Sequence, residues 1–97
     1  MIIVAGELRL DPQLRDRYLA AVADVAPLAR RAAGCLDFVQ AADPLEPDRI
    51  NVYERWESDE ALAAFRSQGG PEEPGAPLPE LRSASVRTFR IASEEAP

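Results

Sequence analysis

The order in which two hydrophobic periodicities follow one another limits this chain to very few folds. Apolar residues alternate with a period of two, typical of strands, in the segments 2–8, 35–42, 49–57 and 81–91. They recur every three or four residues, typical of amphipathic helices, at 12–33 and over two to three turns from residue 59. The predicted order is strand, helix, strand, strand, helix, strand, as in the α+β ferredoxin-like fold. We therefore expect a four-stranded antiparallel sheet with both helices on one face.

Capping and helix-breaking residues set the expected helix ends. Asp11 is placed to cap the first helix, and Gly34 is placed to end it. Pro27 lies inside this helix, where it lacks an amide donor and its ring crowds the carbonyl of Ala23. We therefore expect a kink between Ala23 and Pro27. Ser58 is placed to cap the second helix.

The chain has the length of one small domain, which we place at 1–92. Residues 68–79 hold four prolines and three glycines, a composition that predicts a loop rather than regular structure. The remaining residues, 93–97, are expected to form a polar tail. No internal repeat suggests a second unit.

Both faces of the predicted sheet carry apolar residues. In the first strand, Ile2 and Val4 point to one side, and Ile3 and Ala5 point to the other. Two helices can cover only one face, and the single cysteine, Cys35, cannot form a disulfide within the chain. A second copy of the sheet is the simplest cover for the other face, so we expect a homodimer.

The charge and the missing residue types exclude several classes of function. The net charge is −6 and every basic residue is an arginine, so we expect no nucleic-acid partner. No apolar run approaches the roughly 18 residues that a membrane span needs, and the first residues do not resemble a signal peptide. We therefore expect no membrane partner and a cytoplasmic location. Without histidine or lysine there is no histidine base and no Schiff base, and we expect no metal, flavin or haem cofactor.

Two motifs carry a resemblance to a known family. GCLDFVQ at 34–40 follows the long helix, and YERWESDEALAAF at 53–65 joins the third strand to the second helix. From about residue 2 to residue 67, the chain resembles the antibiotic biosynthesis monooxygenase domain family. The resemblance implies a ferredoxin-like dimer whose two sheets form a barrel, with a pocket between each sheet and its helices. It also implies cofactor-independent oxidation of anthrones or quinols, or, in a separate branch, haem degradation.

The resemblance points to a set of pocket candidates and assigns no catalytic residue. Trp56 matches the family's pocket-lining tryptophan, and packing of the second helix against the sheet is an equally open role for it. Glu54 and Val52 share the face of Trp56 by two-residue alternation. A carboxylate on that face needs an arginine partner, or it has a raised pKa that suits a base. The other expected neighbours are Phe65 from the second helix and Tyr18 and Val22 from the first.

Five further positions are interpreted as structural. Some family members carry an asparagine where this chain has Val52. Asn51 is one position away and faces the other side, so we interpret it as a polar strand residue. Cys35 is expected to act as a small buried hydrophobe. The residues expected on the dimer side or edge of the sheet are Tyr53, Arg55 and Arg87.

Two functions remain open. The haem-degrading branch needs a first-strand asparagine and a histidine ligand, both absent here, so we reject haem degradation. The first function is a cofactor-independent monooxygenase that oxidises a small quinol- or anthrone-like aromatic with O2. The second is a non-catalytic dimeric barrel that binds a small apolar ligand or acts as an accessory protein. The segment RSQGGPEEPGAPLP at 66–79 replaces the family's pocket-closing segment, so the sequence does not decide between them. An enclosed cavity beside Trp56 would favour the first, and a cavity filled by its own side chains the second.

Overall fold

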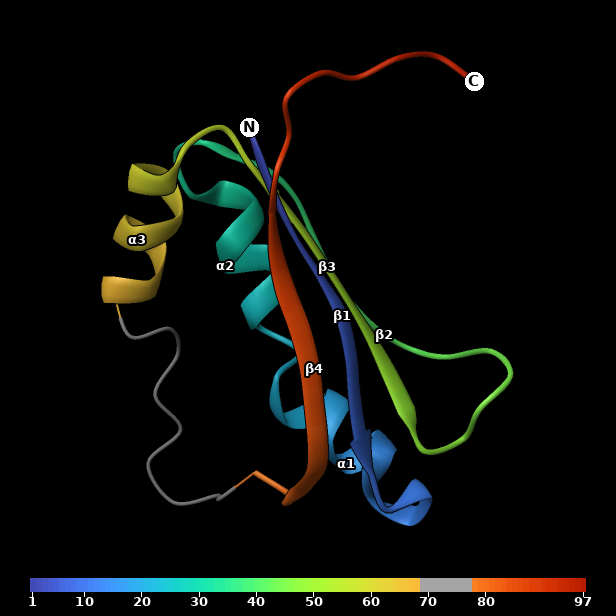
Figure 1. The fold of residues 1–97 in the computed structure, drawn as a ribbon. Coiled ribbons are helices and arrows are strands. Elements are labelled where there is room, and N and C mark those ends of the chain that lie inside the picture. Colours follow the sequence, from blue (N-terminus) through green and yellow to red (C-terminus); the bar gives the residue numbers. More distant parts are fainter. Residues whose placement is uncertain (69–77) are drawn as a thin grey trace.

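The computed structural model describes residues 1–68 and 78–97, and within them four antiparallel strands form one sheet. The strand order is β2-β3-β1-β4, and the helices lie on one face (Figure 1). The strands are β1 (Ile2–Leu10), β2 (Cys35–Ala42), β3 (Arg49–Trp56) and β4 (Leu81–Arg90). The helical elements are η1 (Pro12–Leu14), α1 (Arg15–Ala21), α2 (Val25–Arg31) and α3 (Asp59–Ser67). The expected α+β ferredoxin-like fold is confirmed.

The first helical segment is interrupted rather than kinked. Helix α1 ends at Ala21, and α2 begins at Val25 after a turn. Pro27 consequently falls in the first turn of α2, where its missing amide hydrogen would have no partner within the helix. The expected kink between Ala23 and Pro27 is therefore replaced by a complete break at 22–24, because a new helix that starts just before the proline loses no hydrogen bond.

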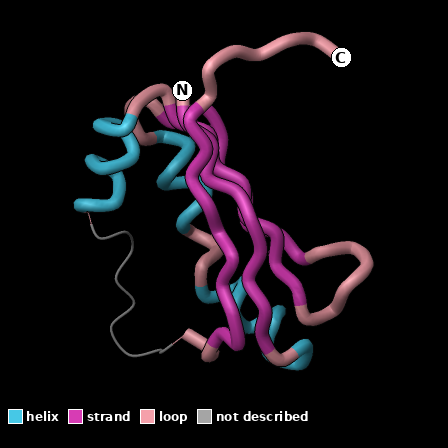
Figure 2. The backbone as a smooth tube through the Cα atoms, viewed as in Figure 1, coloured by secondary structure: helices cyan, strands magenta, loops and turns pink. Residues whose placement is uncertain are grey.

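The other boundaries lie close to the predicted ones. Strand β2 has the predicted bounds, β1 continues two residues further to Leu10, and β3 ends at Trp56. Ser58 caps α3 as expected, since its Oγ accepts a hydrogen bond from the Ala61 amide at 3.1 Å. The predicted loop at 68–79 lies mostly outside the described residues. Figure 2 shows the chain leaving β4 as a loop toward its C-terminus. None of the helices in the described part of the chain is long and apolar enough to cross a membrane.

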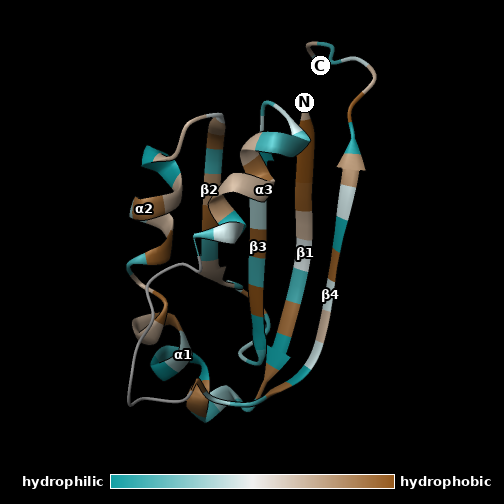
Figure 3. Cartoon of the chain, turned by 90° about the vertical axis from the view of Figure 1, so that its left-hand side faces the viewer, coloured by the Kyte–Doolittle hydropathy of each residue, from teal (hydrophilic) through white to brown (hydrophobic). Residues whose placement is uncertain are grey.

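Buried side chains between the sheet and the helices separate into two clusters along the strands. Even-numbered residues of β1 and β3 point toward the helices, with Ile2 paired opposite Trp56 and Leu8 opposite Ile50. The first group, called the Trp56 cluster, contains Ile2, Val4, Ala29, Phe38, Trp56 and Leu62. The second, called the Tyr18 cluster, contains Leu8, Leu10, Tyr18, Ile50 and Val52. Figure 3 shows the helices in front of β2, β3 and β1, with β4 at the uncovered edge.

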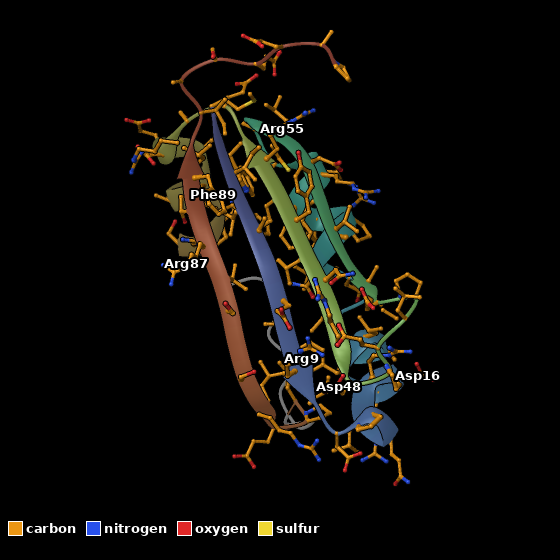
Figure 4. The ribbon with its side chains drawn as sticks, turned by 45° about the vertical axis from the view of Figure 1, so that its right-hand side comes forward. Arg9, Asp16, Asp48, Arg55, Arg87 and Phe89 are labelled. Carbon is orange, nitrogen blue, oxygen red and sulfur yellow. The ribbon has the colours of Figure 1, made fainter. Side chains whose placement is uncertain are left out.

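The opposite side of the sheet, called the open face, changes from apolar to ionic along the strands. At one end, two neighbouring cross-strand rows hold Ile3, Arg55, Phe89, Ala5, Tyr53 and Arg87. Tyr53, Arg55 and Arg87 thus lie on the expected side. The Phe89 side chain is 49% exposed. At the other end, Arg9 donates a hydrogen bond to Asp48 at 2.9 Å, and Figure 4 shows the two ends.

Gly34 lies in the turn between α2 and β2, packed against the first turn of α3. Its φ of +82° is a left-handed conformation that side chains disfavour. Its carbonyl accepts a hydrogen bond from the Glu57 amide at 2.8 Å, just after Trp56. A Cβ at this position would lie 2.4 Å from the Cβ of Ala61 in α3. The close approach of α3 to this turn therefore depends on glycine.

We expect Gly34→Ala to lower the free energy of unfolding by about 1–3 kcal/mol, through backbone strain and overpacking. Urea unfolding of the variant measures this loss. The matched variant Ala61→Gly should itself cost about 1 kcal/mol, because glycine weakens a helix. The double variant should lose less than the sum of the two, since the Cβ contact is gone. Strictly additive losses would contradict the proposed contact.

Candidate functional site

Trp56 ends β3 and anchors α3 to the sheet. Its side chain is fully buried, and its ring centroid lies 5.4 Å from that of Phe65 in α3. Phe65 also makes an edge contact with Phe38 of β2, with centroids 6.3 Å apart. The indole Nε1 donates a hydrogen bond to the Glu54 carboxylate at 3.0 Å. Trp56 therefore joins aromatic packing to a polar contact inside the core.

Glu54 is a half-buried carboxylate on the helix-facing side of β3. It lies opposite Val4 and Phe38 in the neighbouring strands. Burial raises the pKa of Glu54 above its ordinary value, while the Trp56 hydrogen bond and the nearby charge of Arg66 oppose the rise. The sequence predicted either an arginine partner or a raised pKa for this carboxylate. Within the described residues, Glu54 makes no direct contact with an arginine, and its hydrogen-bond partner is the Trp56 indole. A general base is most effective when its pKa is close to the working pH, so a rise in the pKa of Glu54 is in the direction that suits a base.

An open groove of about 490 Å³ runs between α3 and β4. Its helix side comes from one stripe of α3, at spacings of three and four residues, and its strand side comes from the helix-facing positions of β4. The lining residues are Asp59, Leu62, Ala63, Arg66, Thr88 and Arg90. Leu62 also belongs to the Trp56 cluster, so the groove and the buried aromatic rings share a wall. Figure 3 shows α3 in front of β3 and close to β1, with β4 as the next strand outward.

The structure brings together only half of the predicted pocket candidates. Trp56, Glu54 and Phe65 meet at one end of the sheet. The other three pack in or against the Tyr18 cluster, and they are Val52, Tyr18 and Val22. The expected approach of Tyr18 or Val22 to Trp56 is therefore wrong. The helix break at 22–24 turns α2 toward the Trp56 cluster, to which it contributes Ala29, and leaves α1 at the other end.

Thr88 and Arg90, which form the strand side of the groove, were not among the predicted site residues. Their two-residue spacing on β4 shows that they share a face, and this signal was available in the sequence. Their apposition to Asp59, Leu62 and Arg66 depends on how far α3 extends beyond β1, which alternation cannot predict.

Asn51 takes the structural role expected for it, and Cys35 is less buried than expected. On the open face, Asn51 donates a hydrogen bond to the Asp43 carboxylate at 2.8 Å and accepts one from Arg49 at 2.6 Å. Its bond to Asp43, together with two backbone amides, lowers the pKa of that carboxyl to about 2. Cys35 is half-buried against the Trp56 cluster, and burial raises the pKa of its thiol. Neither residue reaches the groove.

Comparison with known proteins identifies the family. Residues 1–70 match the family model described as antibiotic biosynthesis monooxygenase. The chain belongs to the antibiotic biosynthesis monooxygenase family. Among curated proteins, none matches this sequence significantly.

Solved structures with this fold include members and relatives with different descriptions. A candidate antibiotic biosynthesis monooxygenase from Chloroflexus aurantiacus is 27% identical, with 98% of this chain and 96% of that chain covered and a TM-score of 0.67. The heme-degrader MhuD from Mycobacterium tuberculosis, with two hemes bound in its active site, is 18% identical, with 99% and 100% covered and a TM-score of 0.70. A conserved protein of unknown function from Bacteroides thetaiotaomicron, a possible oxidoreductase, is 17% identical, with 93% and 96% covered and a TM-score of 0.71.

The residues of this antibiotic biosynthesis monooxygenase family member do not fit a haem. The sequence holds no histidine to serve as an axial ligand. Cys35 packs against the core with a raised thiol pKa, which disfavours the thiolate that would bind iron. Within the described residues, no group of three histidine, cysteine or acidic side chains is arranged to hold a metal ion. The likeness to MhuD therefore extends to the fold alone.

We expect Glu54→Gln to change how stability depends on pH. Because the pKa of Glu54 is raised by folding, the folded chain binds more protons than the unfolded chain between the ordinary and the raised pKa. The free energy of unfolding of the wild type therefore falls as pH rises through this window. Glu54→Gln should not show this fall, and its amide oxygen can still accept the hydrogen bond from the Trp56 indole. Urea unfolding from about pH 4 to about pH 8 measures it.

The control for this comparison is Glu57→Gln, which removes an exposed carboxylate three residues away on the same strand end. This variant controls for the loss of one negative charge close to Glu54 in the chain. A stability difference between Glu54→Gln and the wild type that does not change with pH would contradict the raised pKa.

Proposed function

We propose that this protein is a monooxygenase that oxidises a small electron-rich aromatic, quinol-like or anthrone-like, with O2 and without a bound cofactor. The observation that carries the proposal is the groove wall that Leu62 shares with the Trp56 cluster. Glu54, a half-buried carboxylate of raised pKa, is bonded to Trp56 of that cluster and lies behind the residues that line the groove. Family membership supports oxidative chemistry of this class. The groove would receive the substrate, the apolar wall would hold its ring, and Glu54 would accept its proton.

The proposed reaction balances without an external reductant. Loss of a proton from the substrate gives an electron-rich anion that transfers electrons to O2. In an anthrone, the ring CH2 becomes a carbonyl, which takes one oxygen atom of O2. The other oxygen atom leaves as water with the two hydrogen atoms of the CH2 group. The protein must orient the anion, exclude bulk water and stabilise charge, and the arginines of the groove can supply the hydrogen-bond donors for that charge.

A second candidate function is supported by the burial of Trp56. The space around its ring is occupied by Phe65 and Phe38, and its side chain has no exposed surface. A site that is filled by its own side chains leaves no enclosed cavity for a substrate beside Trp56. This favours a barrel that binds a small apolar ligand without catalysing a reaction. In that case Glu54 serves only to satisfy the indole N–H.

We also propose that a second copy of this chain covers the open face. The apolar end of this face leaves Phe89 half exposed beside Ile3, with Tyr53 and Ala5 in the next cross-strand row. The Nε of Arg55 is buried with no hydrogen-bond acceptor within the described residues, and a partner sheet could supply one. The ionic end, around Arg9 and Asp48, would flank the apolar contact. The same surface on both copies makes a two-fold dimer.

We expect the wild-type chain to sediment as a dimer at micromolar concentration, and Phe89→Glu to sediment as a monomer, because the new charge would be buried against apolar groups. Leu45→Glu is the matched control. Leu45 is 88% exposed in the β2–β3 connection, away from the apolar end, so this variant should remain a dimer. A wild type that stays monomeric would refute the proposed partner.

We expect oxygen uptake when the purified protein, with metals chelated, meets a panel of quinols and anthrones. Glu54→Gln should lower the rate by about 10²–10⁴-fold, the usual contribution of a general base, while Glu57→Gln keeps it. An oxygen electrode measures the rate, and mass spectrometry checks that one oxygen atom enters the product. Uptake no faster than the uncatalysed rate for every compound would reject the monooxygenase and leave the ligand-binding barrel.

A further inference from the structure

The groove between α3 and β4 carries positive charge in a strongly acidic protein. Two arginines and one aspartate line it, whereas the whole chain has a net charge of −6. Arg66 comes from α3, and Arg90 comes from the facing side of β4, so the two guanidinium groups approach from different elements. An anion inside the groove would therefore meet attraction, although the protein as a whole repels anions.

The arrangement within the groove separates polar from apolar groups. Asp59 accepts a hydrogen bond from Arg90 at 2.6 Å, which holds that side chain across the groove and leaves its other N–H donors for a ligand. Thr88, two residues earlier on the same face of β4, adds a hydroxyl. Leu62 and Ala63 provide apolar surface on the α3 side. The groove thus presents a fork of donors next to an apolar wall.

We propose that the groove selects a ligand with a flat apolar body and a carboxylate, which Arg66, Arg90 and Thr88 bind while the body lies on Leu62 and Ala63. Guanidinium groups bind carboxylates through paired, charge-assisted hydrogen bonds. An inorganic anion lacks the apolar body, and a neutral aromatic leaves the arginines without a partner. This inference rests on the proposed function, because it names the substrate class of the same site: an aromatic quinol or anthrone that bears a carboxylate.

The test compares two non-oxidisable probes that differ only in the carboxylate, 3-hydroxy-2-naphthoate and 2-naphthol, by titration calorimetry. We expect the wild type to bind the acid at least about tenfold more tightly, the scale of a hydrogen bond to a charged group. Arg66→Gln and Arg90→Gln should each remove about tenfold of the acid's affinity and leave that of 2-naphthol unchanged. Inorganic phosphate at equal concentration should not displace the acid.

The matched control is Arg31→Gln, which removes one exposed arginine from α2, outside the groove. It should leave both affinities unchanged, so a loss caused only by the change in net charge is separated from a loss at the site. Arg66→Gln keeps the Arg90–Asp59 contact, so it tests the site even where Arg90→Gln disturbs folding.

The outcomes separate this inference from the proposed reaction. Equal affinity for both probes, binding of neither, or equal losses in all three variants would overturn the carboxylate-binding groove. The monooxygenase would still stand if neutral quinols were oxidised. Arginine-dependent binding of the acid, without oxygen uptake on 1,4-dihydroxy-2-naphthoate or on any compound of the panel, would retain the carboxylate site and reject the monooxygenase.

Discussion

Packing of Phe65 against the buried indole of Trp56 is the contact on which the groove between α3 and β4 depends. It brings α3 back over the sheet directly after β3 ends, and the close approach of Ala61 to Gly34 fixes the helix from the other side. Because α3 is held there, its outer stripe faces β4 across the groove. Loosening the aromatic contact would remove the groove before it removed the sheet.

Sequence patterns predicted the order of elements, the bounds of β2 and the Ser58 cap, because alternation, turn residues and a capping hydroxyl act locally. In the first helical segment they predicted a kink between Ala23 and Pro27, whereas the helix is broken at residues 22–24. Pro27 disfavours a helix interior but suits a first turn, and the sequence does not say which of the two solutions packing favours. The choice depends on contacts that α1 and α2 make with separate parts of the sheet.

The candidate site was predicted in part for the same reason. Trp56 and Glu54 are two residues apart on one strand, and Phe65 follows on the next helix, so their meeting could be expected from local geometry. Tyr18 was expected beside them because the apolar face of one continuous helix would contact the sheet along its whole length. The break divides that face between two clusters. The strand side of the groove needed tertiary information, since Arg90 and Asp59 lie 31 positions apart.

The separation between the buried Trp56–Glu54 pair and the groove surface has an evolutionary consequence. Arg66, Thr88 and Arg90 are exposed side chains on the outer surfaces of regular elements, so replacing them costs little folding free energy. The wall behind them is held by core residues that tolerate few changes. Under the proposed function, surface substitutions can therefore change the ligand preference of the groove while the core behind it stays constant. A chain built in this way can change its substrate without changing its fold.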